Sequence, residues 1–194
     1  MSRPIAVIEL FSGCGAATLG FIQGGARVVV SFENWEPAIA VSAANQELPH
    51  CVVNMELGTR QAWEYITQLF LEFRNSGFHI HIHASPPCQA FSVASTTAPS
   101  EGGFLLHWTL DLIQELNPES WSLENVPPTR KYLPTWCADK WQIVNCADYG
   151  VPQTRKRMIV GEGFILSPTH ENQWVSVLDA LPHLDSMELI PPPS

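Results

Sequence analysis

Long hydrophobic runs, paired cysteines and positive charge are all scarce in this sequence of 194 residues. No apolar stretch approaches the roughly 20 residues that a bilayer-spanning helix needs. The first residues, MSRPIAVIEL, enter a strand-like pattern directly and lack the long apolar core and cleavage site of a signal peptide. These absences argue against membrane and secreted proteins, so we expect a soluble protein of the cytoplasm, or of the nucleus in a eukaryote.

The five cysteines are widely spaced, and no two of them form a CxxC pair. Disulfide scaffolds and zinc ribbons both need closely spaced cysteine pairs. The spacing therefore predicts free thiols in a reducing compartment.

Positive charge is low, with 10 Lys and Arg against 19 Asp and Glu and a net charge of −9. Proteins that bind DNA without a partner carry a basic face, because phosphate contacts dominate the affinity. The net charge is compatible with a local basic patch, but it disfavours a protein that binds DNA without a partner.

What the sequence does have is a regular alternation of strand-like and helix-like segments. Strands are expected at residues 5–11, 27–32, 51–54, 79–84, 120–123, 141–145 and 157–160. Helices are expected at residues 37–45, 60–74 and 105–116, and a mobile polar loop at residues 92–103. This alternation predicts an α/β fold with a mostly parallel sheet and helices on both faces. Ligands of such sheets bind beyond the carboxyl ends of the strands.

We expect one domain over residues 1–166 and a tail over residues 167–194 without a second domain. The tail contains one short amphipathic stretch, at residues 174–181, and ends in three prolines.

A turn with small residues follows the first expected strand, and an acid follows the second. Gly13 and Gly15 allow a ligand to approach the backbone, and Glu33 lies at the position where an acid binds ribose hydroxyls. An ordinary turn and a solvated acid are the alternatives. Together the two features favour an adenosine-containing cofactor, and the turn is not the GxGxxG of nicotinamide enzymes. Asn54 and Glu56 are both candidates for the adenine amino group.

Cys88 follows Pro86 and Pro87 at the carboxyl end of the fourth expected strand. The prolines fix the backbone, so a thiol here is well placed to act as a nucleophile. The alternative is a buried structural cysteine, which is the commoner fate of a lone cysteine. Glu124 follows the fifth strand, at the same expected edge, and a carboxyl group there can donate or accept a proton at a ring nitrogen.

Alternating polar residues begin the last expected strand. Gln153, Arg155 and Arg157 share one face if this segment is extended. Two arginines on one face can hold an anion or a carbonyl oxygen. The alternative is a solvated basic strand start.

Three histidines, His79, His81 and His83, alternate along the fourth expected strand and therefore share a face. Alternate histidines can bind a metal. We interpret them instead as hydrogen-bonded histidines of the core or of an interface, and we predict no metal site.

Five segments in order, ELFSGCG, FENWEPA, PPCQAFS, LENV and YGVPQTRKR, resemble the motifs of the DNA cytosine carbon-5 methyltransferases. The resemblance extends to about Pro182. It implies a Rossmann-like methyltransferase fold, S-adenosyl-L-methionine as cofactor and cytosine in DNA as substrate.

The resemblance also implies roles for individual residues. The residues that it implies for cofactor binding are Phe11, Gly13, Gly15, Glu33 and Pro87, the last of which precedes Cys88. Two further candidates for cofactor binding are Asn54 and Trp35, and the Trp35 ring could stack on the adenine. Cys88 is implied as the nucleophile and Glu124 as the residue that holds the cytosine ring. Gln89, Asn125 and Gln153 are implied as substrate-binding residues, and Arg155 and Arg157 as completing the catalytic pocket, one of them on the cytosine carbonyl oxygen.

The sequence also departs from the family. It ends at Ser194, without the target-recognition domain and the C-terminal motifs that follow in the family. The loop at residues 92–103 has no Lys or Arg, the stretch between Val126 and Asn145 is too short for the usual helix, and Ala16 replaces a glycine. We therefore expect that a second subunit or a homodimer supplies the missing segments.

Two other functions remain open on the sequence. One is a regulatory or binding protein that descends from such an enzyme and has lost activity. The other is methylation of RNA or of a free nucleotide, which needs no recognition domain.

Overall fold

The centre of the computed structural model is a seven-stranded sheet, and the structure describes residues 3–45, 52–88 and 99–183. In chain order the strands are β1 (Ile5–Leu10), β2 (Arg27–Glu33), β3 (Val52–Asn54), β4 (His79–Ala84), β5 (Ser120–Asn125), β6 (Trp141–Asn145) and β7 (Lys156–Glu162). Across the sheet they run in the order β3-β2-β1-β4-β5-β7-β6, and β7 is antiparallel to both of its neighbours. The predicted α/β fold with a mostly parallel sheet is confirmed.

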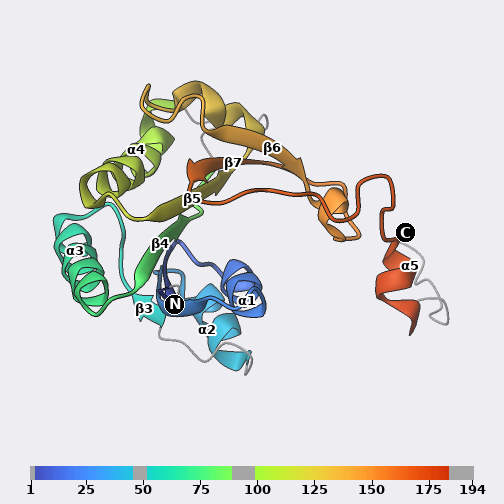
Figure 1. The fold of residues 1–194 in the computed structure, drawn as a ribbon, viewed down its shortest axis with the longest axis horizontal. Coiled ribbons are helices and arrows are strands. Elements are labelled where there is room, and N and C mark those ends of the chain that lie inside the picture. Colours follow the sequence, from blue (N-terminus) through green and yellow to red (C-terminus); the bar gives the residue numbers. More distant parts are fainter. Residues whose placement is uncertain (1–2, 46–51, 89–98, 184–194) are drawn as a thin grey trace, which may run out of the picture.

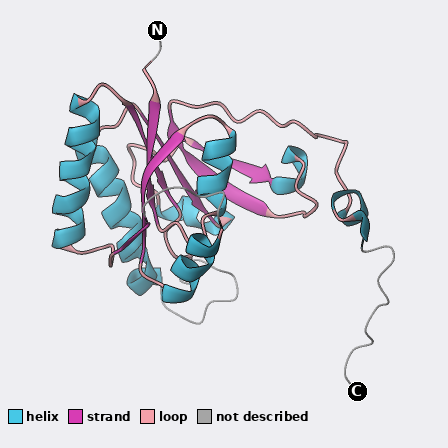
Figure 2. Cartoon of the chain, turned by 90° about the horizontal axis from the view of Figure 1, so that it is seen from below, coloured by secondary structure: helices cyan, strands magenta, loops and turns pink. Residues whose placement is uncertain are grey.

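Helices cover both faces of this sheet. The α-helices are α1 (Ala16–Gln23), α2 (Glu36–Ala44), α3 (Arg60–Asn75), α4 (Pro99–Leu116) and α5 (Val177–Ala180), and the 3₁₀ helices are η1 (Pro127–Tyr132) and η2 (Cys146–Tyr149). Figure 1 shows α1 and α2 on one side of the sheet and α3 and α4 on the other. The turned view in Figure 2 shows the same layers, with the last part of the chain extending away from them. No helix of the described residues is long and apolar enough to cross a membrane.

The face toward α3 and α4 holds the main apolar core. Helix α3 begins at its cap Thr59, whose hydroxyl accepts a hydrogen bond from the Ala62 N–H at 3.1 Å. It buries Ala62, Ile66 and Phe70, which are spaced four residues apart and so form one stripe. This stripe packs in one cluster with apolar strand residues such as Ile82.

The face toward α1 is polar where β1, β2, β4 and β5 cross it. Glu9 is buried and accepts hydrogen bonds from Ser31 at 3.0 Å and from Thr18 of α1. His81 and His83 are also buried, and the Phe21 ring of α1 lies 5.4 and 5.2 Å from theirs. Both imidazoles are hydrogen-bonded to serines of β5, which confirms the prediction of hydrogen-bonded core histidines.

Some predicted boundaries were wrong. Helix α4 begins at Pro99, inside the predicted loop, because proline suits the first turn of a helix. Strand β1 ends at Leu10 because Phe11 has a positive φ of 57°, which no strand residue adopts. Helix α1 had no counterpart in the predicted elements. Between β5 and β6, where all residues are described, the structure has the 3₁₀ helix η1 and no α-helix.

Candidate functional site

A cavity of about 650 Å³ opens at the carboxyl edge of the parallel strands. Its walls come from the segments that follow β1 to β5, from the start of β7 and from the first turns of α4. The antiparallel direction of β7 brings its start, rather than its end, to this edge. The volume lies within the range of sites for small molecules and cofactors, about 300 to 1,000 Å³.

One side of the cavity combines Gly13 with Glu33. The Glu33 carboxylate accepts hydrogen bonds from the N–H groups of Gly13 at 2.8 Å and of Asn34 and Trp35 at 2.9 Å each. These bonds fix the carboxylate and leave one of its roughly four acceptor positions for a ligand. A Cβ added at Gly13 would meet no atom within 4 Å, so the space beside this turn is open. Both features fit an adenosine ribose.

The adjoining wall is apolar and was missed by the sequence predictions. It includes Met55, Leu57, Phe104 and Leu105, and the Phe104 side chain is 57% exposed. A Cβ at Gly58 would lie 2.6 Å from the Leu105 Cδ2, so glycine is what permits this close approach. An exposed aromatic beside Gly58 suits a flat ring such as adenine, and no signal in the linear sequence distinguishes Phe104 from a core residue.

Cys88 lines the same cavity, two residues after Pro86, whose carbonyl is held by a hydrogen bond. The buried Asn125 side chain donates to the Pro86 carbonyl at 3.0 Å, and its oxygen accepts from the Val126 N–H and the Thr129 hydroxyl, each at 2.8 Å. Asn125 therefore joins the segment after β4 to the segment after β5. The four described cysteines, including Cys88, are free, as predicted for those positions.

Glu124 faces the cavity and forms an ion pair with Arg157, with Nε and Oε1 2.6 Å apart. Burial raises the pKa of the Glu124 carboxyl above its usual value, and Arg157 and Arg155 oppose part of that rise. A raised pKa makes this carboxyl a better proton donor near neutral pH. Arg155 also lines the cavity, and its charge acts on the Glu124 carboxyl from there.

Several predicted site residues lie away from the cavity lining. Gly15 caps α1 with a φ of 88°, and the Trp35 side chain, at the start of α2, is 65% exposed. The Asn54 amide donates to Glu36 at 2.9 Å, whereas Glu56, the other candidate for adenine, does line the cavity.

The expected alternation from Gln153 is corrected, because β7 begins only at Lys156 and Gln153 lies exposed in the preceding bend. Of the residues that flank Cys88, Pro87 lines the cavity and Gln89 lies outside the described residues. No group of three or more His, Cys, Asp and Glu side chains within the described ranges is placed to hold a metal.

A family of known proteins shares this arrangement. The profile of the C-5 cytosine-specific DNA methylases matches residues 5–132, which span β1 to η1. The chain belongs to the C-5 cytosine-specific DNA methylase family.

Other methylases of the family resemble the chain over most of its length. The type II methyltransferase M.HindV of Haemophilus influenzae is 29% identical over 162 residues, which cover 77% of this chain and 50% of M.HindV. M.HgiDI of Herpetosiphon aurantiacus is 31% identical over 166 residues, or 79% of this chain and 50% of that methyltransferase. The chain thus spans about half the length of these relatives.

Solved methyltransferase structures share the fold. A DNA modification methyltransferase encoded within an E. coli prophage superimposes with a TM-score of 0.61 at 25% identity, over 91% of this chain and 54% of its own. The Dnmt2 methyltransferase of S. pombe superimposes with a TM-score of 0.56 at 18% identity, over 84% of this chain and 52% of its own. The predicted methyltransferase fold is confirmed by these superpositions.

Proposed function

We propose that this chain is the catalytic half of an S-adenosyl-L-methionine-dependent methyltransferase that acts on carbon 5 of cytosine in DNA. The observation that carries the proposal is the shared cavity, on which Cys88 and the Glu124–Arg157 pair lie together with Gly13 and Glu33. The first group suits attack on a pyrimidine ring and the second suits an adenosine.

The cofactor supplies the methyl group as an electrophile when it is bound. Glu33 would accept a hydrogen bond from one of its ribose hydroxyls, and Phe11 and Gly13 would border the cofactor where the backbone lies open. Glu56 and the apolar wall of Leu57 and Phe104 would hold the adenine.

The reaction at cytosine begins with Cys88, because carbon 5 is a weak nucleophile. The Cys88 thiolate forms a bond to carbon 6, and the ring's electrons make carbon 5 nucleophilic. Glu124, whose pKa is raised by burial, shares a proton with ring nitrogen 3 and stabilises the charge that develops. Arg155 or Arg157 binds the carbonyl oxygen, and Asn125 holds the Cys88 segment in place through Pro86.

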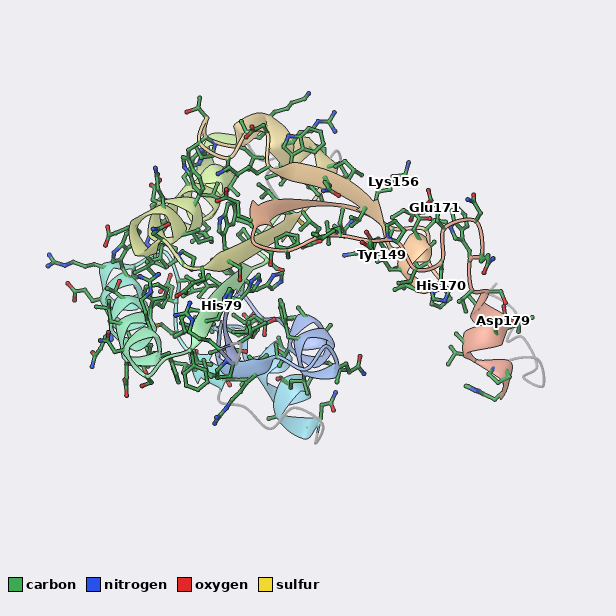
Figure 3. The ribbon with its side chains drawn as sticks, in the orientation of Figure 1. His79, Tyr149, Lys156, His170, Glu171 and Asp179 are labelled. Atoms are coloured by element: carbon green, nitrogen blue, oxygen red, sulfur yellow. The ribbon has the colours of Figure 1, made fainter. Side chains whose placement is uncertain are left out.

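A partner for target recognition is supported by the surface of the chain. Reading a base sequence in the major groove needs side chains that reach the base edges. The segment after β7 exposes large apolar side chains, with Ile165 at 90%, Trp174 at 55% and Leu178 at 52%. Figure 3 shows this segment, with His170 and Asp179 labelled, away from the sheet. We propose that a second polypeptide or a second copy of the chain covers it.

The test is a covalent adduct on DNA in which 5-fluorocytosine replaces cytosine throughout, so that every target sequence is present. With labelled S-adenosylmethionine, we expect a complex of the chain and the DNA that survives denaturation. The reaction is run both with the chain alone and with the product of the neighbouring reading frame added as a possible partner. Cys88→Ala abolishes the adduct, and Cys146→Ala, at a free thiol outside the cavity lining, keeps it.

Two results would contradict the proposal. Cofactor binding without any adduct on DNA would favour a regulatory protein. An adduct on RNA but not on DNA would move the substrate to RNA.

A further inference from the structure

Six side chains form an unbroken row of hydrogen bonds on the face of β4 and β5 that faces α1. In order they are His79, Ser120, His81, Ser122, His83 and Ser85, with successive N···O distances of 2.9, 2.8, 2.9, 2.8 and 3.3 Å. The histidines alternate along β4 and two of the serines along β5, so the strand register itself builds the row.

The two ends of the row lie in different places. Ser85 lines the cavity that holds Cys88. His79, labelled in Figure 3, begins β4 at the opposite edge of the sheet, where it is partly exposed. Glu119 lies at this edge, paired with the exposed Arg3 at 2.9 Å. The row therefore connects the cavity with solvent on the far side of the sheet.

The middle of the row is buried. His81 and His83 are 7% and 8% exposed, and the Phe164 ring closes over His81 at 6.3 Å between centroids. Burial lowers the pKa of His81 to about 3 and that of His83 to about 4, so both imidazoles are neutral at pH 7. Glu9 of β1 pairs with His83 in the strand register, but its carboxyl bonds to Thr18 and Ser31 and stands outside the row.

Neutral imidazoles and hydroxyls give the row a direction. Each neutral imidazole has one N–H and one acceptor nitrogen, and each serine hydroxyl donates one hydrogen bond. When each serine donates to one neighbouring imidazole and accepts from the other, all the links run in the same direction. A row in which each member both donates and accepts is the arrangement that passes a proton from end to end.

We propose that this row is a proton relay that carries protons from the cavity to the far edge of the sheet. It rests on the proposed function, because methylation of cytosine at carbon 5 releases the hydrogen of that carbon as a proton. The carbon–hydrogen bond breaks, its electron pair forms the double bond between carbons 5 and 6, and the carbon–sulfur pair leaves with Cys88 as thiolate.

The released proton passes to the Ser85 hydroxyl, directly or through one water, as Ser85 gives its own proton to Nε2 of His83. Each following member accepts one proton and passes one on, until Nδ1 of His79 releases a proton to solvent. The net charge of the row is unchanged after one proton has passed along it.

The test breaks the row at its centre, at a buried residue outside the cavity lining. Ser122→Ala removes the hydroxyl that bridges His81 and His83, and Ser122→Thr keeps a hydroxyl. Ser31→Ala is the control, since it removes a buried hydroxyl of the same face that lies outside the row. The full chain is given labelled S-adenosylmethionine and DNA with tritium at carbon 5, and the first-turnover methyl transfer is compared with steady-state tritium release.

A relay predicts that Ser122→Ala keeps the first methyl transfer but slows tritium release about tenfold or more, so that the methylated covalent adduct accumulates. Ser122→Thr restores the release, and Ser31→Ala leaves both rates unchanged. Equal tritium release by the Ala and Thr variants, with both proteins folded, would overturn the relay while leaving the proposed function intact. A wild-type chain that transfers no methyl group under any condition would overturn the proposed function, and the relay with it.

Discussion

The two faces of β4 and β5 are equally buried but differ in chemistry. Toward α3 and α4 they present Ile82 and Leu123, which are fully buried among other apolar side chains. Toward α1 they present His81, His83 and Ser122, which are almost as inaccessible and are hydrogen-bonded to one another and to Ser120 and Ser85. Apolar burial stabilises a fold directly, whereas buried polar groups at best recover what their desolvation costs. The comparison indicates that the first face stabilises the sheet, and the second is the face on which we propose the proton relay.

Acidification should act on the polar face most strongly. The folded-state pKa values of His81 and His83, about 3 and about 4, lie below the unfolded value near 6.5, so the unfolded chain binds these protons first. Their contribution to stability is therefore complete above about pH 6.5 and is lost as the pH falls toward 4. From pH 7 to pH 5 the loss is about 4 kcal/mol in the free energy of unfolding, measured by urea denaturation.

The matched control for this pH dependence is the double variant His81→Gln, His83→Gln, which keeps polar side chains that do not titrate. Its free energy of unfolding should change much less between pH 7 and pH 5 than that of the wild type. An unchanged slope would mean that these two histidines do not titrate as buried groups.

Removing one side chain from each face sharpens the comparison at neutral pH. Ile82→Ala leaves a cavity in the apolar core and should cost about 3 kcal/mol in the free energy of unfolding. Ser122→Ala leaves two imidazole nitrogens without their partner and should cost about 2 kcal/mol.

The two variants should also differ in the rate of tritium release. At a temperature where both are folded, this rate should fall in Ser122→Ala and stay near the wild-type rate in Ile82→Ala.

A smaller effect is expected where the cavity wall meets the apolar core. Gly58→Ala strains a φ of 90° and places a Cβ 2.6 Å from Leu105, so it should lower the free energy of unfolding by about 2 kcal/mol and weaken cofactor binding. Gly77→Ala is the control, because it has a similar φ of 86° and no atom within 4 Å of the added Cβ. Calorimetry with S-adenosylmethionine should show weaker binding for Gly58→Ala alone, and equal binding by the two variants would remove this wall from the site.

Much of the site could be predicted because strand ends determine it. Cys88 and Glu124 are far apart in the chain, yet each follows a parallel strand, and the rule that such ends share an edge placed both on one cavity. Gln153 was expected to share the face of Arg155 and Arg157, but a bend rather than a strand precedes Lys156. Alternation of polar residues along the sequence does not show at which residue a strand begins.

Other features depend on tertiary packing. Phe104 falls between the predicted loop and the predicted helix, and its place on the cavity depends on the packing of α4 beside Gly58. The alternation of His79, His81 and His83 was visible in the sequence, whereas the serines that complete their hydrogen bonds lie about 40 residues later and become neighbours only through the strand register. Helix α1 was not anticipated, because its sequence AATLGFIQ has no charged residue at its ends and contains a glycine.

The most direct measurement is peptide mapping by mass spectrometry of the complex formed with fluorinated DNA and S-adenosylmethionine. The account predicts a nucleotide bonded to the peptide that contains Cys88, with a methyl group added to carbon 5 of its base. A nucleotide on Cys14 or Cys146, or a base without the added methyl group, would contradict it.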